Sequence, residues 1–171
     1  MGLFLIGGKI LMMNKLNDKI GKKYKSILVG AGRFGMYLSD DDKRLKPATH
    51  FELLSTDSRT ELLGVCDINQ SSLERAQSIL PDIQVSENID VLLREIKPEI
   101  VSIASWKENH FEMINKCIDH HVKAIICEKP IATNLDDCIA LKNKLNKSNS
   151  KLLINHRRRF DELLYEVVEL L

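Results

Sequence analysis

Short apolar runs alternate along this chain with longer segments whose apolar residues recur at helical spacing. The apolar runs are rich in β-branched residues and end at glycine, proline or polar residues, which predicts strands over 25–29, 61–66, 84–85, 99–104, 122–127 and 151–155. Apolar residues three or four positions apart predict helices from His50 onward and over 71–80, 89–96, 108–120, 134–145 and 161–171. We expect Ser71 or Ser72 and Thr133 or Asn134 to cap two of them.

The regular alternation of strand and helix predicts an α/β fold, a doubly wound parallel sheet with helices on both faces. We expect residues 24–156 to form this domain and residues 157–171 to begin a second one. Residues 1–23 are expected to be a poorly ordered leader. Their apolar part, residues 1–13, is too short to span a bilayer and lacks the cleavage site of a signal peptide.

Composition and charge limit the kinds of partner that we expect. Apolar residues make up 44% of the 171 residues and charged residues 29%, with a formal net charge of +1. This balance creates no field that favours nucleic acid or an anionic membrane. The four cysteines form no C-x-x-C pair and have no histidine at metal-ligand spacing, so we expect buried thiols, no metal site and a cytoplasmic protein.

A glycine-rich turn, Gly30-Ala-Gly-Arg-Phe-Gly35, follows the first predicted strand and precedes a helical start. The first glycine permits the tight turn, Gly32 lets the backbone approach a pyrophosphate, and Gly35 lets the next helix pack close to the strand. N–H groups at the helix start would then face the diphosphate. The alternative is a turn without a ligand, but the strand and helix on either side favour a Rossmann-type dinucleotide site.

Asp67 closes the second predicted strand, where a carboxylate can accept hydrogen bonds from the adenosine ribose and repel a 2′-phosphate. It therefore favours NAD over NADP, although Arg33 could accommodate the phosphate and leave NADP possible. Asp67 lies 32 residues after Gly35, against about 20 in the usual spacing. We attribute the excess to a polar loop over residues 40–47. The alternative is an ordinary aspartate at a turn.

Five segments, residues 30–35, 65–69, 103–110, 127–132 and 155–161, occur in the order typical of one oxidoreductase family. The fourth contains Glu-Lys-Pro. Together they make residues 25–165 resemble the glucose–fructose oxidoreductase/inositol dehydrogenase/rhizopine catabolism (Gfo/Idh/MocA) family. The resemblance implies a nicotinamide dinucleotide-binding domain, which in relatives is followed by a second domain that holds the substrate.

The resemblance implies that Lys129 is the catalytic residue, with Glu128 on the nicotinamide side. A lysine at the carboxyl edge of a parallel sheet suits this role, because its ammonium can stabilise charge that develops on a substrate oxygen. The alternative is a solvated surface lysine. The resemblance also implies a cis peptide between Lys129 and Pro130, a bond type in which the cis form costs little. The turn and the family segments together predict the cofactor-binding residues Gly30, Gly32, Arg33, Phe34, Gly35, Asp67, Ala104, Ser105, Trp106, His110, Glu128, Lys129, Pro130 and Arg158.

The chain departs from the family pattern at Ser105-Trp106, where threonine-proline is more usual, and this leaves the shape of that turn open. His110 either contacts the cofactor or packs the start of its helix. His50 could reach the mouth of the site, but we expect it only to begin a helix.

The resemblance implies an NAD(P)-dependent oxidoreductase that transfers hydride at a C–OH of a sugar, sugar nucleotide or cyclitol. The alternatives are a non-catalytic dinucleotide-binding or interaction module and an inert fragment. The chain ends inside an apolar helix, which suggests a truncated substrate domain. We therefore expect weak or no activity from this chain alone, and a homo-oligomer that covers the apolar face of that helix.

Overall fold

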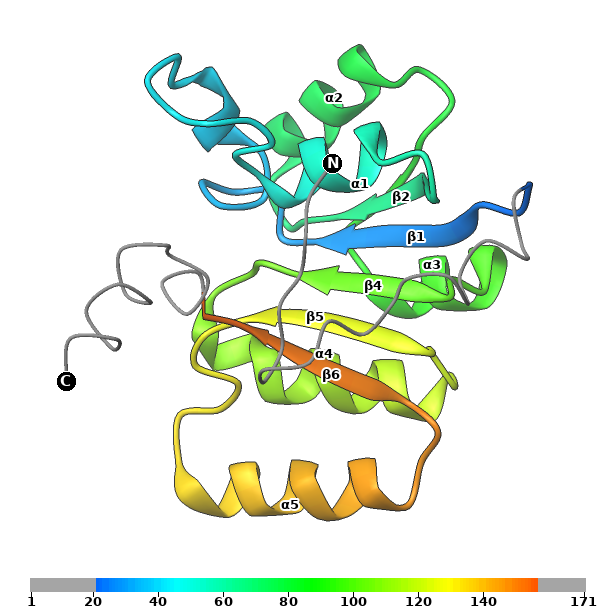
Figure 1. The fold of residues 1–171 in the computed structure, drawn as a ribbon, viewed down its shortest axis with the longest axis vertical. Helices are drawn as coiled ribbons and strands as arrows, with labels where there is room; N and C mark the ends of the chain where they lie inside the picture. Colours follow the sequence, from blue (N-terminus) through cyan, green and yellow to red (C-terminus); the bar gives the residue numbers. More distant parts are fainter. Residues whose placement is uncertain (1–20, 157–171) are drawn as a thin grey trace, which may run out of the picture.

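The structure, a computed structural model, describes residues 21–156, which form a parallel sheet between two layers of helices (Figure 1). The strands are β1 (Tyr24–Val29), β2 (Thr60–Cys66), β3 (Gln84–Ser86), β4 (Ile100–Ile103), β5 (Ala124–Glu128) and β6 (Lys151–Asn155). Their spatial order is β3-β2-β1-β4-β5-β6, and every neighbouring pair is parallel. The predicted doubly wound α/β fold is confirmed, and the strand order reverses between β1 and β4.

The helices divide between the two faces of the sheet. They are α1 (His50–Thr56), α2 (Gln70–Ile79), α3 (Ile89–Ile96), α4 (Lys107–Asp119) and α5 (Leu135–Asn146), with a 3₁₀ turn η3 (Tyr37–Asp40). Helices α1 and α2 pack on β1 and β2 from one side, whereas α3, α4 and α5 share the core on the other side. Within residues 21–156, no helix is long and apolar enough to cross a bilayer.

Strand β1 shows why the apolar runs predicted strands correctly. Ile27 and Val29 join the core under α3 and α4, and Leu28 between them joins the core under α1 and α2. A strand covered on both faces has no solvated side, so its sequence is continuously apolar rather than alternating.

The helix caps are asparagines more often than the sequence suggested. Asn69 caps α2 by accepting a hydrogen bond from the Ser71 N–H, so the expectation that Ser71 or Ser72 is the cap was wrong. Asn134 caps α5 through the Asp137 N–H, as one of the two expected alternatives. Serine, threonine and asparagine can all cap a helix. Because α2 begins at Gln70, earlier than predicted, the residue before it, Asn69, is the cap.

The helical start expected after the glycine turn is only a short turn, and the chain then makes an excursion over residues 36–49 before α1 begins. The first two N–H groups of α1 bond back to the turn, from His50 to the Phe34 carbonyl at 3.2 Å and from Phe51 to the Gly35 carbonyl at 2.9 Å. Helix α1 therefore resumes where the interrupted turn stopped, and the excursion supplies the extra residues before Asp67. The predicted helix over 161–171 and residues 1–20 of the leader predicted over 1–23 lie outside the described residues.

Leu141 is the one residue of α5 that is fully buried, and it joins the core beneath β5. We expect Leu141→Ala to lower the free energy of unfolding by about 2–5 kcal/mol, because it removes buried methyl groups and leaves a cavity. The matched control is Leu135→Ala, since Leu135 is 72% exposed at the start of the same helix; its effect should stay within about 0.5 kcal/mol. Urea unfolding followed by circular dichroism measures both, and equal losses would contradict the packing of α5.

Candidate functional site

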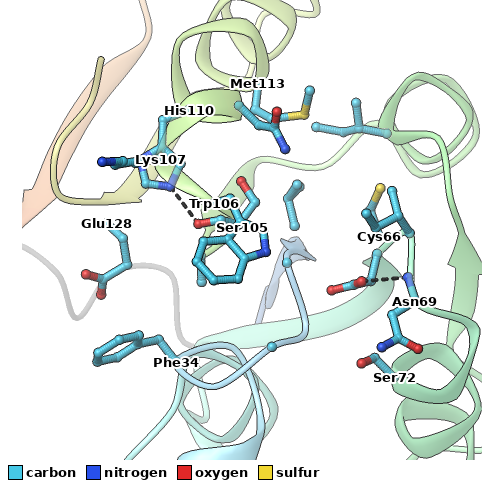
Figure 2. Close-up of a pocket in the computed structure, with 18 of the residues that line it drawn as sticks. Phe34, Cys66, Asn69, Ser72, Ser105, Trp106, Lys107, His110, Met113 and Glu128 are labelled. Atoms are coloured by element: carbon cyan, nitrogen blue, oxygen red, sulfur yellow. Dashed lines mark hydrogen bonds between the residues drawn. The ribbon is translucent and has the colours of Figure 1, made fainter. Parts of the chain in front are cut away.

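A cleft of about 1140 Å³ opens at the carboxyl ends of the strands, around the point where their order reverses. Ligands of doubly wound sheets bind at this position. Figure 2 shows Glu128 and Phe34 at one end of the cleft and Cys66, Asn69 and Ser72 at the other. The indole ring of Trp106 lies between the two ends.

The glycine turn forms one wall of the cleft, and its glycines differ in what surrounds them. Gly30 has a φ of +88°, and a β-carbon there would collide with the backbone nitrogen of Ser105. A β-carbon on Gly35 would collide with the carbonyl oxygen of Gly30. Around the same position on Gly32, no atom lies within 4 Å. Gly30 and Gly35 therefore bring backbones together, while Gly32 leaves open space beside the cleft.

The turn also presents unused backbone donors. Its first local hydrogen bond runs from the Met36 N–H to the Gly32 carbonyl at 2.8 Å. Within the described part of the chain, the N–H groups of residues 32–35 have no protein acceptor. They correspond to the unpaired N–H groups of a helix N-terminus, which attract anions.

Asp67, at the end of β2, is tied to the same turn. Its Oδ2 accepts a hydrogen bond from the Ala31 N–H at 2.6 Å, and its Oδ1 accepts one from the Asn69 N–H at 2.8 Å. An ionised carboxylate has about four acceptor positions, so both oxygens keep capacity for a ligand. The carboxylate is half-buried and lines the cleft.

The turn after β4 contributes Ala104, Ser105 and Trp106. The Ser105 hydroxyl is buried and has no hydrogen-bond partner within residues 21–156. Trp106 precedes α4 without capping it, and its side chain is 78% exposed. Phe34 from the glycine turn is also largely exposed. The cleft thus offers two exposed aromatic rings, and its wall contains a buried hydroxyl that has no hydrogen-bond partner within residues 21–156.

His110 joins two of the turns that line the cleft. It is 1% exposed, and its Nδ1 lies 2.7 Å from the Pro130 carbonyl oxygen and its Nε2 2.9 Å from the Ser105 carbonyl oxygen. Both partners are acceptors, so a neutral imidazole donates to one of these carbonyl groups at a time; the ring is enclosed by backbone on both sides, which favours a packing role for His110. The peptide between Lys129 and Pro130 is cis, as predicted.

Glu128 ends β5 and contacts His50, a residue that the sequence analysis expected only to begin a helix. Its Oε1 accepts hydrogen bonds from Asn155 Nδ2 at 2.6 Å and from His50 Nε2 at 3.0 Å. Burial raises the pKa of Glu128, but these hydrogen bonds outweigh it and hold the pKa below its usual value. His50 begins α1 and also bonds to Glu128, although its buried ring does not itself line the cleft; the expectation that it only begins the helix missed this contact.

Two other ionisable groups at the cleft are not available for chemistry. Burial raises the pKa of the Cys66 thiol to about 12, so it stays neutral and is a poor nucleophile. Lys116 is held by Asp90 at 2.9 Å and Glu112 at 3.1 Å, and these partners raise its pKa. No group of three or more potential metal ligands is found within residues 21–156.

The predicted site residues come together in this cleft. All of those in the described part of the chain line it except Gly35, which packs against Gly30 instead. Arg158 lies outside the described residues. The sequence analysis missed several lining residues, most of them in the connection after a strand or the first turns of the next helix: Tyr37, Ile68, Asn69, Ser72, Asn109, Met113 and Lys116. Their position after a strand end is the signal that could have found them.

Comparison with known proteins gives one family. A model of the Gfo/Idh/MocA oxidoreductase family, NAD-binding Rossmann fold, matches residues 25–156. Similar curated proteins include an inositol 2-dehydrogenase from Gluconacetobacter diazotrophicus, 28% identical over 102 residues that cover 58% of this chain and 30% of that protein. A glucose-6-phosphate 3-dehydrogenase from Bacillus subtilis is 30% identical over 111 residues, which cover 65% of this chain and 31% of that protein.

Solved structures share the fold. The scyllo-inositol dehydrogenase from Lactobacillus casei, with bound NAD(H) and scyllo-inositol, gives a TM-score of 0.72 at 20% identity and covers 87% of this chain and 42% of that chain. The myo-inositol 2-dehydrogenase from Lactobacillus plantarum gives 0.71 at 18% identity and covers 86% of this chain and 41% of that chain. The chain spans about a third of the length of the curated relatives.

The glycine contacts predict a contrast between two substitutions in one turn. Gly35→Ala should lower the free energy of unfolding by about 1–3 kcal/mol, because the new β-carbon meets a backbone carbonyl that cannot rotate away. Gly32→Ala should change it by at most about 1 kcal/mol, since open space surrounds that position. Chemical unfolding of both variants tests this, and an equal effect at the two positions would contradict the described turn.

Proposed function

Because the chain belongs to the Gfo/Idh/MocA oxidoreductase family, we propose that residues 24–156 are its dinucleotide-binding domain and that NAD(H) lies along the cleft. The observation that carries this proposal is the glycine turn, whose N–H groups at residues 32–35 have no acceptor within residues 21–156. Gly32 leaves space for a pyrophosphate to approach them. The buried Ser105 hydroxyl is a further donor without a partner in the described chain.

In this proposal the adenosine ribose lies at Asp67. The hydrogen bonds from the N–H groups of Ala31 and Asn69 orient the carboxylate and leave acceptor capacity for ribose hydroxyls. The same charge would repel a 2′-phosphate, so NAD is preferred over NADP. Arg33 lines the cleft and is the group that would weaken this preference.

The opposite end of the cleft takes the nicotinamide. Glu128, Lys129 and Pro130 line it together with the exposed rings of Phe34 and Trp106. An aromatic side chain that is uncovered in the free protein gains buried area when a planar ring packs on it. Arg158, also assigned to the cofactor by the resemblance, lies outside the described residues.

For the whole protein we propose hydride transfer at a C–OH of a sugar, sugar nucleotide or cyclitol. The nicotinamide supplies the hydride acceptor or donor. Lys129 donates or accepts the proton of the substrate hydroxyl, and its exposed side chain at the strand edge can reach a substrate above the cleft. Turnover also needs a substrate held against the ring, which contributes up to about 7–11 kcal/mol of the barrier reduction.

Substitution of Gly32 tests the cofactor path. Gly32→Asp should weaken NADH binding about 100-fold or more, equivalent to about 2.8 kcal/mol, because it fills the pyrophosphate space and adds like charge. Gly32→Ser is the matched control, because it adds a small side chain at the same residue without a charge. It should weaken NADH binding less than Gly32→Asp does. NADH titration can follow the fluorescence of Trp106, the one tryptophan of the chain. Unchanged NADH affinity in Gly32→Asp would reject the cleft as the cofactor site.

Substitution of Asp67 tests the choice of cofactor. The wild-type protein should bind NADH more tightly than NADPH, and Asp67→Asn should narrow the ratio about tenfold, close to 1.4 kcal/mol. Asparagine keeps an acceptor oxygen for the Ala31 N–H but carries no charge to repel the 2′-phosphate. Arg33→Ala is the matched control and should weaken NADPH more than NADH. A wild-type protein that prefers NADPH would overturn the assignment of Asp67.

A further inference from the structure

A continuous row of hydrogen bonds crosses the sheet beneath the Glu-Lys-Pro turn. The Ser102 hydroxyl in β4 lies 2.6 Å from Nδ1 of His50, and Nε2 of His50 lies 3.0 Å from Oε1 of Glu128. Asn155, the last residue of β6, donates to the same Oε1 at 2.6 Å. His50 and Ser102 are both buried. The row thus links four elements, α1, β4, β5 and β6, and two of them, α1 and β6, donate to the carboxylate of β5.

The donors in this row favour the ionised form of Glu128. The Asn155 amide nitrogen can only donate, and Ser102 can donate to Nδ1 of His50, which leaves the proton of His50 on Nε2. Oε1 then accepts two hydrogen bonds, as an ionised carboxylate does. The direction of the pKa shift of Glu128 agrees with this. Burial raises the pKa, but the hydrogen bonds from His50 and Asn155 lower it by more, so the net shift is downward.

The surroundings of the carboxylate contain few other charges. Among the described residues, His50 from α1 is the titratable group in contact with it. β6 contributes the neutral Asn155 amide, β4 contributes the Ser102 hydroxyl behind the imidazole, and the neighbouring backbone N–H of Lys129 also favours the anion. The side chain of Lys129 is exposed to solvent, which screens its charge.

We propose that His50 is a positioning residue that holds Glu128 as an anion at the nicotinamide end of the cleft, and that this anion biases the site toward oxidised NAD⁺ over NADH. The inference rests on the proposed function, because it takes the nicotinamide to lie beside Glu128. The oxidised ring carries a positive charge and the reduced ring does not. A half-buried, fixed carboxylate therefore attracts one redox form and is nearly indifferent to the other.

The proposal predicts how the preference depends on pH. The pKa of Glu128 is lowered in the folded protein, so the preference for NAD⁺ is present above that pKa and is lost as the pH falls through it. Removing the hydrogen bond from His50 raises this pKa, so the preference should be lost at a higher pH. A change in this midpoint is a readout that a merely structural role of His50 would not produce.

The experiment measures the ratio of the NADH and NAD⁺ dissociation constants between pH 4.5 and 8.5 by isothermal titration calorimetry on the full chain. Because the pKa of Glu128 is held below its usual value, the wild-type preference should persist across this range. Relative to wild type, His50→Leu should reduce the preference for NAD⁺ about threefold to tenfold and move its midpoint upward. His50→Gln should restore most of the preference, because its amide can donate to Glu128. Glu128→Gln should abolish the preference at every pH in this range, because the amide carries no charge.

The outcomes separate this inference from the proposed function. If the wild-type protein binds neither form, the proposed function fails and the inference with it. If binding occurs but His50→Leu weakens both forms equally, with no change in the midpoint, His50 is structural and the inference is overturned. Should His50→Leu not fold, Asn155→Ala removes the other donor to Oε1 and must shift the ratio and midpoint in the same direction. An unchanged ratio in Asn155→Ala and Glu128→Gln would also overturn it.

Discussion

The close approach of the glycine turn to the end of β4 is the contact on which the cleft depends. Gly30 brings its backbone against Ser105, and Gly35 brings the next turn against the Gly30 carbonyl, so that no β-carbon fits at either position. Because β1 and β4 flank the reversal of strand order, this contact holds together the two connections that line the middle of the cleft. Two glycines thus set how closely these two walls of the cleft approach each other.

The same turn also determines where α1 begins. The carbonyl groups of Phe34 and Gly35 accept the first N–H groups of α1, so the helix resumes in place after an excursion over residues 36–49. Arg75 of α2 holds that excursion by pairing with Asp40 and lying 4.6 Å from the centre of the Tyr37 ring. An insertion in the first connection therefore leaves the dinucleotide turn intact and still delivers His50 to Glu128.

The sequence predicted most of the fold because central strands such as β1 are buried on both faces and continuously apolar, and the helices repeat apolar residues at helical spacing. It also predicted the glycine turn and the site residues at the strand ends, since these follow from the local sequence. It did not predict the role of His50, whose partners Ser102 and Glu128 are 52 and 78 residues away. Contacts at such separations depend on the strand order, which no local pattern encodes. The cap of α2 was missed for a different reason, because three neighbouring residues have similar capping ability.

Two histidines hold the Glu-Lys-Pro turn from opposite faces of the sheet. His50 comes from α1 and contacts the Glu128 carboxylate, while His110 comes from α4 and contacts the Pro130 carbonyl. Lys129 lies between these two anchored neighbours, with an exposed side chain. His50 fixes a side chain before Lys129 and His110 contacts the backbone after it, and both contacts reduce the freedom of the turn. In the proposed reaction, mainly the lysine side chain would then have to be ordered against a substrate held by another part of the protein.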